Sequence, residues 1–142
     1  MWWPFRKKKD DAGDVRHRAG RWGEKQAERH LRGLGFRILA RRLRVGRRDE
    51  IDLMARDGDT LVFVEVKTRA SEDFGRPISS VTRDKRHALS RAAIRYMTGL
   101  RRPPAYFRFD VVEVIGTEGQ GTPEIRHIPN AFTLHPSYRV PW

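Results

Sequence analysis

A strand pattern interrupted by charge is the feature that most constrains this chain. Residues 60–68 read TLVFVEVKT, a run of apolar and β-branched residues that is typical of a buried strand. Side chains alternate across a strand, so the three valines share one face, whereas Glu65 and Lys67 share the other. One face can therefore pack against a helix, while the opposite face presents a carboxylate and an ammonium two residues apart.

The preceding segment predicts the partner of this strand. Residues 49–55, DEIDLMA, form a second strand-like run, and the linking RDGD contains Asp-Gly, a strong signal of a β-hairpin. Directly opposed residues of an antiparallel pair point to the same side of the sheet. The position of the turn therefore decides which side chains of residues 49–55 meet Glu65.

Two even-length turns are compatible with the sequence. With Gly58 and Asp59 at the centre of the turn, Asp52 lies directly opposite Glu65. A turn centred one residue earlier instead opposes Glu50 and Glu65, with Asp52 beside them on the same face. Both turns bring Asp52 and Glu65 to the side that carries the lysine, whereas an odd-length loop or a bulge would separate them.

The two carboxylates indicate a divalent cation, because like charges on neighbouring strands repel unless a cation joins them. An all-oxygen ligand set suits Mg²⁺ or Mn²⁺, which keep several waters and also bind substrate phosphate. Lys67 adds a positive charge beside the expected phosphate or attacking water. Asp52, Glu65 and Lys67 are thus the predicted catalytic residues of a phosphodiesterase site. The alternative is a cross-strand salt bridge, which is what a Glu-X-Lys taken alone more often forms.

The positive charge of the chain is placed unevenly. The net charge is +12; residues 1–48 hold 16 Lys and Arg against 5 Asp and Glu, whereas residues 49–142 hold 14 against 13. Such asymmetry predicts a surface for a polyanion, first of all DNA and secondly RNA, because phosphate contacts supply most non-specific affinity. A merely solubilising surface is the alternative. The basic residues assigned to nucleic-acid binding are Arg21, Lys25, Arg41, Arg42, Arg44, Arg47, Arg48 and Arg69.

Composition excludes several other classes of protein. The chain has no cysteine, which excludes disulfides, thiolate zinc sites and thiol catalysis. No apolar run approaches the ~20 residues of a membrane span, and the start of the chain lacks an apolar region of signal-peptide length. The five histidines show no metal-ligand spacing. We therefore expect a cytoplasmic protein without a membrane partner.

The order of predicted elements indicates an α/β fold with one domain. Helices are expected at 19–34 and 78–98, and strands at 36–45, 49–55, 60–68, 106–115 and 124–132. In the first strand Phe36, Ile38 and Ala40 share a face, and its arginines are typical of a sheet edge. Residues 1–18 read as a flexible basic arm, residues 19–133 as the domain and residues 134–142 as a C-terminal tail.

The run DEIDLMARDGDTLVFVEVKTRA resembles the core of the PD-(D/E)XK nuclease superfamily, the restriction-endonuclease-like fold. It looks closest to the uncharacterised YraN family, which is itself similar to archaeal Holliday-junction resolvases. The resemblance extends to GRWGEKQAERHLRGLGFRILARRLR, GRPISSVTRDKRHALSRAAIRYM, RFDVVEV and IRHIPNAF, and so covers about residues 19–133. It implies a three-layer sandwich in which helices flank a mixed four- or five-stranded sheet.

The resemblance also implies roles for single residues. Asp52 and Glu65 match metal ligands, Lys67 matches the catalytic lysine, and Glu24 matches an acidic residue of the first helix that often completes the metal site. Periodicity places Glu24 on the core-facing side of that helix, although a solvated helix carboxylate is the alternative. Further candidates for the site are Glu28, Glu50 and Lys85.

One segment departs from the family pattern. The family usually reads Gly-Glu-Ile-Asp after a short loop carrying an Asn, whereas here Arg47, Arg48 and Asp49 separate Gly46 from the Glu, and Arg42 stands where Asn is common.

The prediction for function is a Mg²⁺- or Mn²⁺-dependent endodeoxyribonuclease that hydrolyses DNA phosphodiester bonds, with branched or structured DNA as a candidate substrate. A homodimer is compatible with cutting a junction at two places. The alternative is a non-catalytic nucleic-acid-binding accessory protein that retains the nuclease fold.

Overall fold

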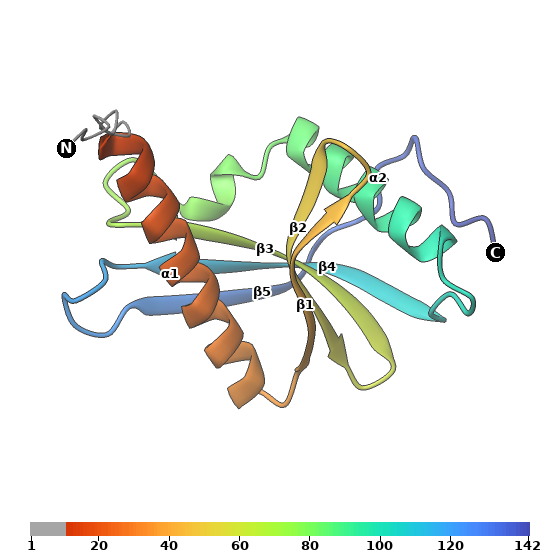
Figure 1. Ribbon diagram of the computed structural model, residues 1–142, viewed down its shortest axis with the longest axis horizontal. Coiled ribbons are helices and arrows are strands. Elements are labelled where there is room, and N and C mark those ends of the chain that lie inside the picture. Colours follow the sequence, from red (N-terminus) through yellow and green to blue (C-terminus); the bar gives the residue numbers. More distant parts are fainter. Residues whose placement is uncertain (1–10) are drawn as a thin grey trace, which may run out of the picture.

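The computed structural model describes residues 11–142, and Figure 1 shows their arrangement. Two α-helices, one short 3₁₀ helix and five strands make up this part of the chain. In chain order they are α1 (Asp11–Gly33), β1 (Arg37–Val45), β2 (Asp49–Asp57), β3 (Thr60–Arg69), η1 (Pro77–Ser80), α2 (Arg83–Thr98), β4 (Tyr106–Ile115) and β5 (Glu124–Phe132).

The strands form one mixed sheet in the order β1-β2-β3-β4-β5. Only β3 and β4 run parallel, because the connection between them passes through η1 and α2, whereas the other neighbours are antiparallel. α1 crosses one face of the sheet, as Figure 1 shows, and α2 packs against the other. The predicted α/β sandwich with a mixed four- or five-stranded sheet is confirmed, with five strands, and it is compatible with a restriction-endonuclease-like fold.

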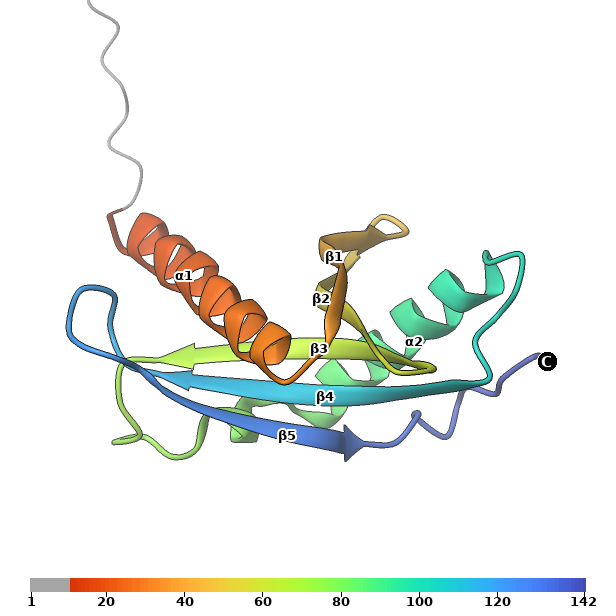
Figure 2. The same cartoon turned by 90° about the horizontal axis from the view of Figure 1, so that it is seen from below.

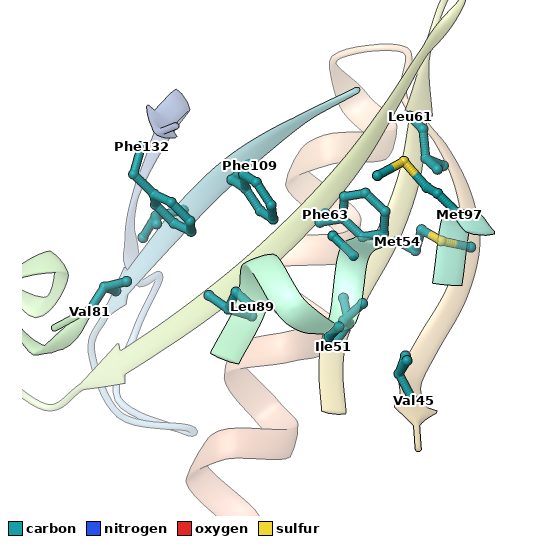
Figure 3. Close-up of a cluster of buried hydrophobic side chains, with 13 residues drawn as sticks. Val45, Ile51, Met54, Leu61, Phe63, Val81, Leu89, Met97, Phe109 and Phe132 are labelled. Atoms are coloured by element: carbon teal, nitrogen blue, oxygen red, sulfur yellow. The ribbon is translucent and has the colours of Figure 1, made fainter. Parts of the chain in front are cut away.

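Each face of the sheet has its own hydrophobic core. Under α2, Phe63, Phe109 and Met97 are almost fully buried, and Figure 3 shows this cluster. Under α1, the three valines of β3 pack against Ala27 and Leu31. The prediction that the valine face of β3 packs against a helix is therefore confirmed.

The β2–β3 hairpin has the first of the two predicted turns. Asp57 pairs with Thr60 across Gly58 and Asp59, and Gly58 has the positive φ of 60° that such a tight turn requires. The pairing continues for five rungs and stops at Leu53 and Val64. Beyond this rung the two strands diverge, so Asp52 and Glu65, which the same register would oppose, are not paired.

The divergence of β2 from β3 has a physical cause on the side of α2. The Asp49 carboxylate accepts two hydrogen bonds from the Arg91 guanidinium of α2, at 2.7 and 2.8 Å. Ile51 is fully buried in the core under the same helix. The outer halves of β1 and β2 therefore follow α2, and Figure 2 shows their tip standing away from the plane of β3, β4 and β5. We call the resulting gap between Asp52 and Glu65 the strand fork.

Both edges of the sheet are irregular. In β1 the register shifts between Ile38 and Ala40, so that Ile38 packs on the α1 side and Ala40 on the α2 side. The expectation that these two residues share a face is thus wrong, because the bulge inserts one residue. In β5, Asn130 has a φ of 51° and the preceding Pro129 has no N–H to donate.

The boundary predicted for the N-terminal arm is wrong for residues 11–18, which belong to α1. From Gly13 to Arg18 the helix is exposed, so this part shows no apolar stripe from which its periodicity could be recognised. The rest of the predicted arm, residues 1–10, lies outside the described residues. Neither helix of residues 11–142 combines the length and apolarity needed to cross a membrane.

The residues predicted as a C-terminal tail run along α2. The His135 backbone N–H donates to Ser90 Oγ at 2.9 Å, and the Tyr138 hydroxyl lies 2.9 Å from a ring nitrogen of His87. Leu134 packs against the larger core.

β4 carries two fully buried carboxylates, Asp110 and Glu113. Burial favours a higher pKa for Asp110, but hydrogen bonds from His127, Arg108 and the backbone of residue 130 outweigh it and hold the pKa below its usual range. The same holds for Glu113. Burial raises its pKa, but hydrogen bonds from Ile78 N, Arg76 and Arg126 outweigh burial, so that the pKa lies below its usual range. Asp110 thus has the structural role that its buried position favours.

We predict that acid destabilises the protein through these two carboxylates. Both have a lower pKa in the folded chain, so their stabilising contribution is complete above the unfolded-state values of about 4 and is lost as the pH falls through the folded values. Urea unfolding between about pH 7 and pH 3 should show falling stability below about pH 5. Asp110→Asn should be less stable at neutral pH and less sensitive to acid. If the free energy of unfolding falls equally steeply with decreasing pH in the variant and the wild type, this assignment is wrong.

Candidate active site

On the side of β2, the Asp52 side chain spans the strand fork and binds the backbone of β3. The Val66 backbone N–H, which has lost its main-chain partner beyond the last rung, donates to Asp52 Oδ2 at 2.9 Å. A strand N–H lies close to the plane of its sheet, so the Asp52 carboxylate sits in the gap between the strands rather than on one face. The sequence predicted that Asp52 would lie opposite Glu65. The pairing in fact stops one rung earlier, and this hydrogen bond was not predicted.

Glu65 enters the fork from β3 and is 3% exposed. Its Oε1 atom lies 3.2 Å from Lys67 Nζ of the same strand and 3.6 Å from Lys85 Nζ of α2. Its Oε2 atom is buried and has no hydrogen-bond partner among the described residues. A buried carboxylate oxygen without a partner is costly, so Glu65 has an unused ligand position that points to a cation or a water.

Glu24 reaches the same place from α1. A close approach of this helix to β3 brings it there: a Cβ added to Gly23 would lie 1.8 Å from Thr68 Oγ1 and 2.9 Å from Thr68 Cβ. Glu24 is half-buried and lines a cavity of about 370 Å³ together with Asp52, Glu65 and Lys67. The structure therefore gathers the three predicted metal ligands and the predicted catalytic lysine around one cavity.

The electrostatics of the cavity are those of crowded carboxylates. Burial, followed by the charges of Glu65 and Glu24, raises the pKa of Asp52 well above its usual range, against the Val66 hydrogen bond. Burial also raises the pKa of Glu24, although Arg42 opposes the rise. Each carboxylate would keep its charge more easily beside a cation, because a cation offsets both desolvation and mutual repulsion.

The other acidic candidates lie elsewhere. Glu28 forms ion pairs with Arg32 and Arg41 and does not line the cavity of Glu65. Glu50 is exposed on the outer part of β2 and does not line the cavity, but it lies close enough to Glu24 for its charge to help raise the pKa of Glu24. Lys85, in contrast, reaches Glu65 from α2.

The donor set fits a hard cation, although it is not a preformed cage. Within residues 11–142 no three His, Asp or Glu side chains lie close enough together to count as a ready metal site. The unpartnered Glu65 Oε2 and the facing Asp52 carboxylate are nonetheless the oxygen donors that Mg²⁺ or Mn²⁺ requires, and both ions complete their shells with water and substrate oxygens. Asp52 and Glu65 would hold such an ion, with Glu24 across the cavity as the third donor.

The basic residues predicted to bind nucleic acid divide into groups. Arg69 lines the cavity just described. Four others line a second cavity between α1 and β1, which shares Glu24 with the first: Arg21, Lys25, Arg41 and Arg42. Three more are exposed around the β1–β2 turn: Arg44, Arg47 and Arg48.

Some residues that shape the site escaped the sequence analysis. The ion pair of Asp49 with Arg91 directs β2 away from β3, but the two residues are far apart in the chain and their spacing carries no signal. Gly23 permits the close approach of α1 to β3. The only sequence signal for this contact is that Thr68 falls on the same face of β3 as the three valines.

Fold and site together define a basic α/β protein with an Asp and a Glu-X-Lys motif in a strand fork. The chain belongs to the Uncharacterised protein family UPF0102, whose profile matches residues 23–114. The resemblance to the YraN-like family is thereby confirmed.

Three relatives show how far the similarity extends. A UPF0102 protein of Parafrankia sp. (strain EAN1pec) is 46% identical over 118 residues, which cover 83% of this chain and 98% of the relative. A UPF0102 protein of Chlorobaculum tepidum is 46% identical over 119 residues, covering 81% and 92%. One of Symbiobacterium thermophilum is 47% identical over 116 residues, covering 81% and 96%. Glu24, Asp52, Glu65 and Lys67 lie within the residues that the family profile matches, whereas Arg21 of the second cavity lies just outside them.

We predict opposite effects for two glycine substitutions in α1. Gly23→Ala should lower the free energy of unfolding by about 1–3 kcal/mol, because the added methyl overlaps Thr68. Gly20→Ala is the matched control, since nothing lies within 4 Å of its added methyl, and it should raise stability by about 0.5–1 kcal/mol. Urea unfolding of both variants measures the difference. Equal effects would show that α1 does not depend on close contact at Gly23.

Proposed function

We propose that this protein is a divalent-metal-dependent endonuclease that hydrolyses DNA phosphodiester bonds. The observation that carries the proposal is the buried Glu65 Oε2 atom, which lacks a partner in a fork that also holds Asp52 and two lysines. A carboxylate serving only as a salt-bridge partner would not need a second oxygen buried without a hydrogen bond.

Each residue of the fork has a role in this proposal. Asp52 and Glu65 would hold a metal ion together with Glu24, and such an ion would supply positive charge and Lewis acidity at the phosphate. The Val66 N–H fixes the orientation of the Asp52 carboxylate. Lys67 lies beside Glu65 at 3.2 Å and places an ammonium where negative charge develops on the phosphate or where the attacking water binds.

The charge of the molecule supports DNA as the substrate. The net charge of +12 attracts a polyanion. Arg69 lines the cavity of the fork, and four further basic residues line the second cavity, which shares Glu24 with it. Branched or structured DNA is the substrate class that we propose, and a substrate cut on two strands would engage two copies of the protein. The cytoplasm, where chromosomal DNA of a bacterial cell lies, remains the expected location.

A second candidate function is non-catalytic nucleic-acid binding. Its supporting observation is that Glu65 already has two ammonium groups within 3.6 Å, so that its charge is balanced without a metal ion. An accessory protein of this kind would bind DNA through the same basic surface.

We predict cleavage of DNA that requires both the metal and Glu65. Junction, flap, single-stranded and duplex DNA would be incubated with the protein and Mg²⁺ or Mn²⁺, and the products resolved on denaturing gels. Glu65→Gln and Lys67→Met should each reduce the cleavage rate at least about 100-fold, because each removes a group that acts on the reacting phosphate. Glu118→Gln, an exposed carboxylate in the β4–β5 turn, is the control and should cleave like the wild type.

Calorimetry with Mn²⁺ provides a readout that does not depend on activity. The wild type should bind the ion, and Glu65→Gln should bind it at least about tenfold more weakly. DNA binding without metal binding or cleavage would favour the accessory protein. Cleavage that persists in the double variant Glu65→Gln, Lys67→Met would overturn the nuclease proposal.

A further inference from the structure

The second cavity has the charge of an anion site. It measures about 310 Å³ and lies between α1 and β1, beside the proposed cleavage site, with which it shares Glu24. Four cationic side chains and two carboxylates line it. Glu28 is already engaged by Arg41 and Arg32, and within residues 11–142 neither Arg21 nor Lys25 has a carboxylate partner. The cavity thus keeps an excess of positive charge.

Arg42 is held in this cavity by an unusual backbone. Its φ is 43°, in the left-handed region that non-glycine residues seldom adopt. The rungs on both sides are formed, Arg41 with Leu53 and Leu43 with Ile51, but the position of Arg42 itself, across from Asp52, is not paired. Such local strain costs of order 1 kcal/mol or more and is concentrated at functional sites. The side chain of Arg42 lies toward α1, where it contacts Glu24.

The Arg42 guanidinium has donors to spare. Its Nε atom lies 3.7 Å from Glu24 Oε2, which is too long for a good hydrogen bond. Its Nη1 atom is buried without any partner among the described residues, while the side chain as a whole is 37% exposed. A guanidinium presents its donors in a fixed fork that matches phosphate oxygens, so a phosphate entering the cavity would bind the exposed part of the Arg42 side chain.

We propose that Arg42, Arg21 and Lys25 form a phosphodiester-binding subsite. This subsite holds the nucleic-acid strand next to the phosphate that the strand fork cleaves, and Arg42 is its positioning residue. Its part in cleavage rests on the proposed function, whereas its binding of a phosphodiester does not. The competing view is that Arg42 only supports Glu24 and has no ligand of its own.

The test measures binding without cleavage. Fluorescence anisotropy with a labelled single-stranded oligonucleotide in EDTA gives affinity in the absence of any divalent metal. Arg42→Asn should weaken binding about tenfold, because it removes a charge-assisted contact to one phosphate. The slope of log affinity against log salt concentration should become shallower by about 0.7. Asn tolerates a left-handed backbone, so thermal stability should be retained or improved.

Arg37→Asn is the matched control. Arg37 is exposed on the same strand, does not line the cavity and loses the same charge, so its affinity should change less than about twofold. Arg42→Gly, which also permits a positive φ, and Lys25→Gln are further variants in case Arg42→Asn does not fold. Both should weaken binding more than Arg37→Asn does.

The outcomes separate the subsite from the proposed function. Equal losses of affinity in Arg42→Asn and Arg37→Asn would mean that binding depends only on diffuse charge, and would overturn the subsite. Unchanged DNA affinity together with impaired cleavage in Arg42→Asn would also overturn it, because Arg42 would then act only by supporting Glu24. A specific loss of binding in Arg42→Asn, in a protein that cleaves no DNA with Mg²⁺ or Mn²⁺, would establish the subsite and refute the nuclease.

Discussion

The hydrogen bond from the Val66 N–H to the Asp52 carboxylate is the interaction on which the candidate site depends. A partly buried backbone donor left without an acceptor costs about 1–3 kcal/mol, so two strands that separate inside a sheet need a substitute for the missing rung. Here a side chain provides it and thereby becomes fixed in the plane of the sheet. Glu24 can then approach from the α1 side and Glu65 from β3, which a pair of fully hydrogen-bonded strands would not permit.

The fork and its carboxylates are positioned by contacts on both faces of the sheet. On one face, Asp49 is bound to Arg91 and Ile51 is buried, so that the outer part of β2 packs with α2. On the other, the missing side chain of Gly23 lets α1 lie directly on Thr68. The crowded carboxylates are therefore kept together by the packing of two helices, which supplies the free energy that their repulsion and desolvation oppose.

The parts of the structure that local sequence determines were predictable. The Asp-Gly turn set the register of β2 and β3, and the valines at alternate positions identified the face under α1. What could not be predicted came from contacts between distant residues or from single irregularities. The fork depends on the distant Arg91, which binds Asp49. Ala40 changes face because the bulge inserts one residue in β1. Nothing in the arginine-rich sequence around Arg42 indicates its positive φ. The first turns of α1 were missed because they are solvated and show no apolar period.

The irregular edges of the sheet have a consequence for association between copies of the chain. Sheets of two molecules join most readily through long, flat edge strands with free N–H and C=O groups. β1 is bulged at Leu39, rich in arginine and twisted at Arg42, and β5 is interrupted by Pro129 and Asn130. A continuous intermolecular sheet is thus disfavoured at either end, by geometry and by charge repulsion. Two copies brought together on a nucleic acid would have to meet through helices or loops, with the polyanion between them neutralising the facing arginines.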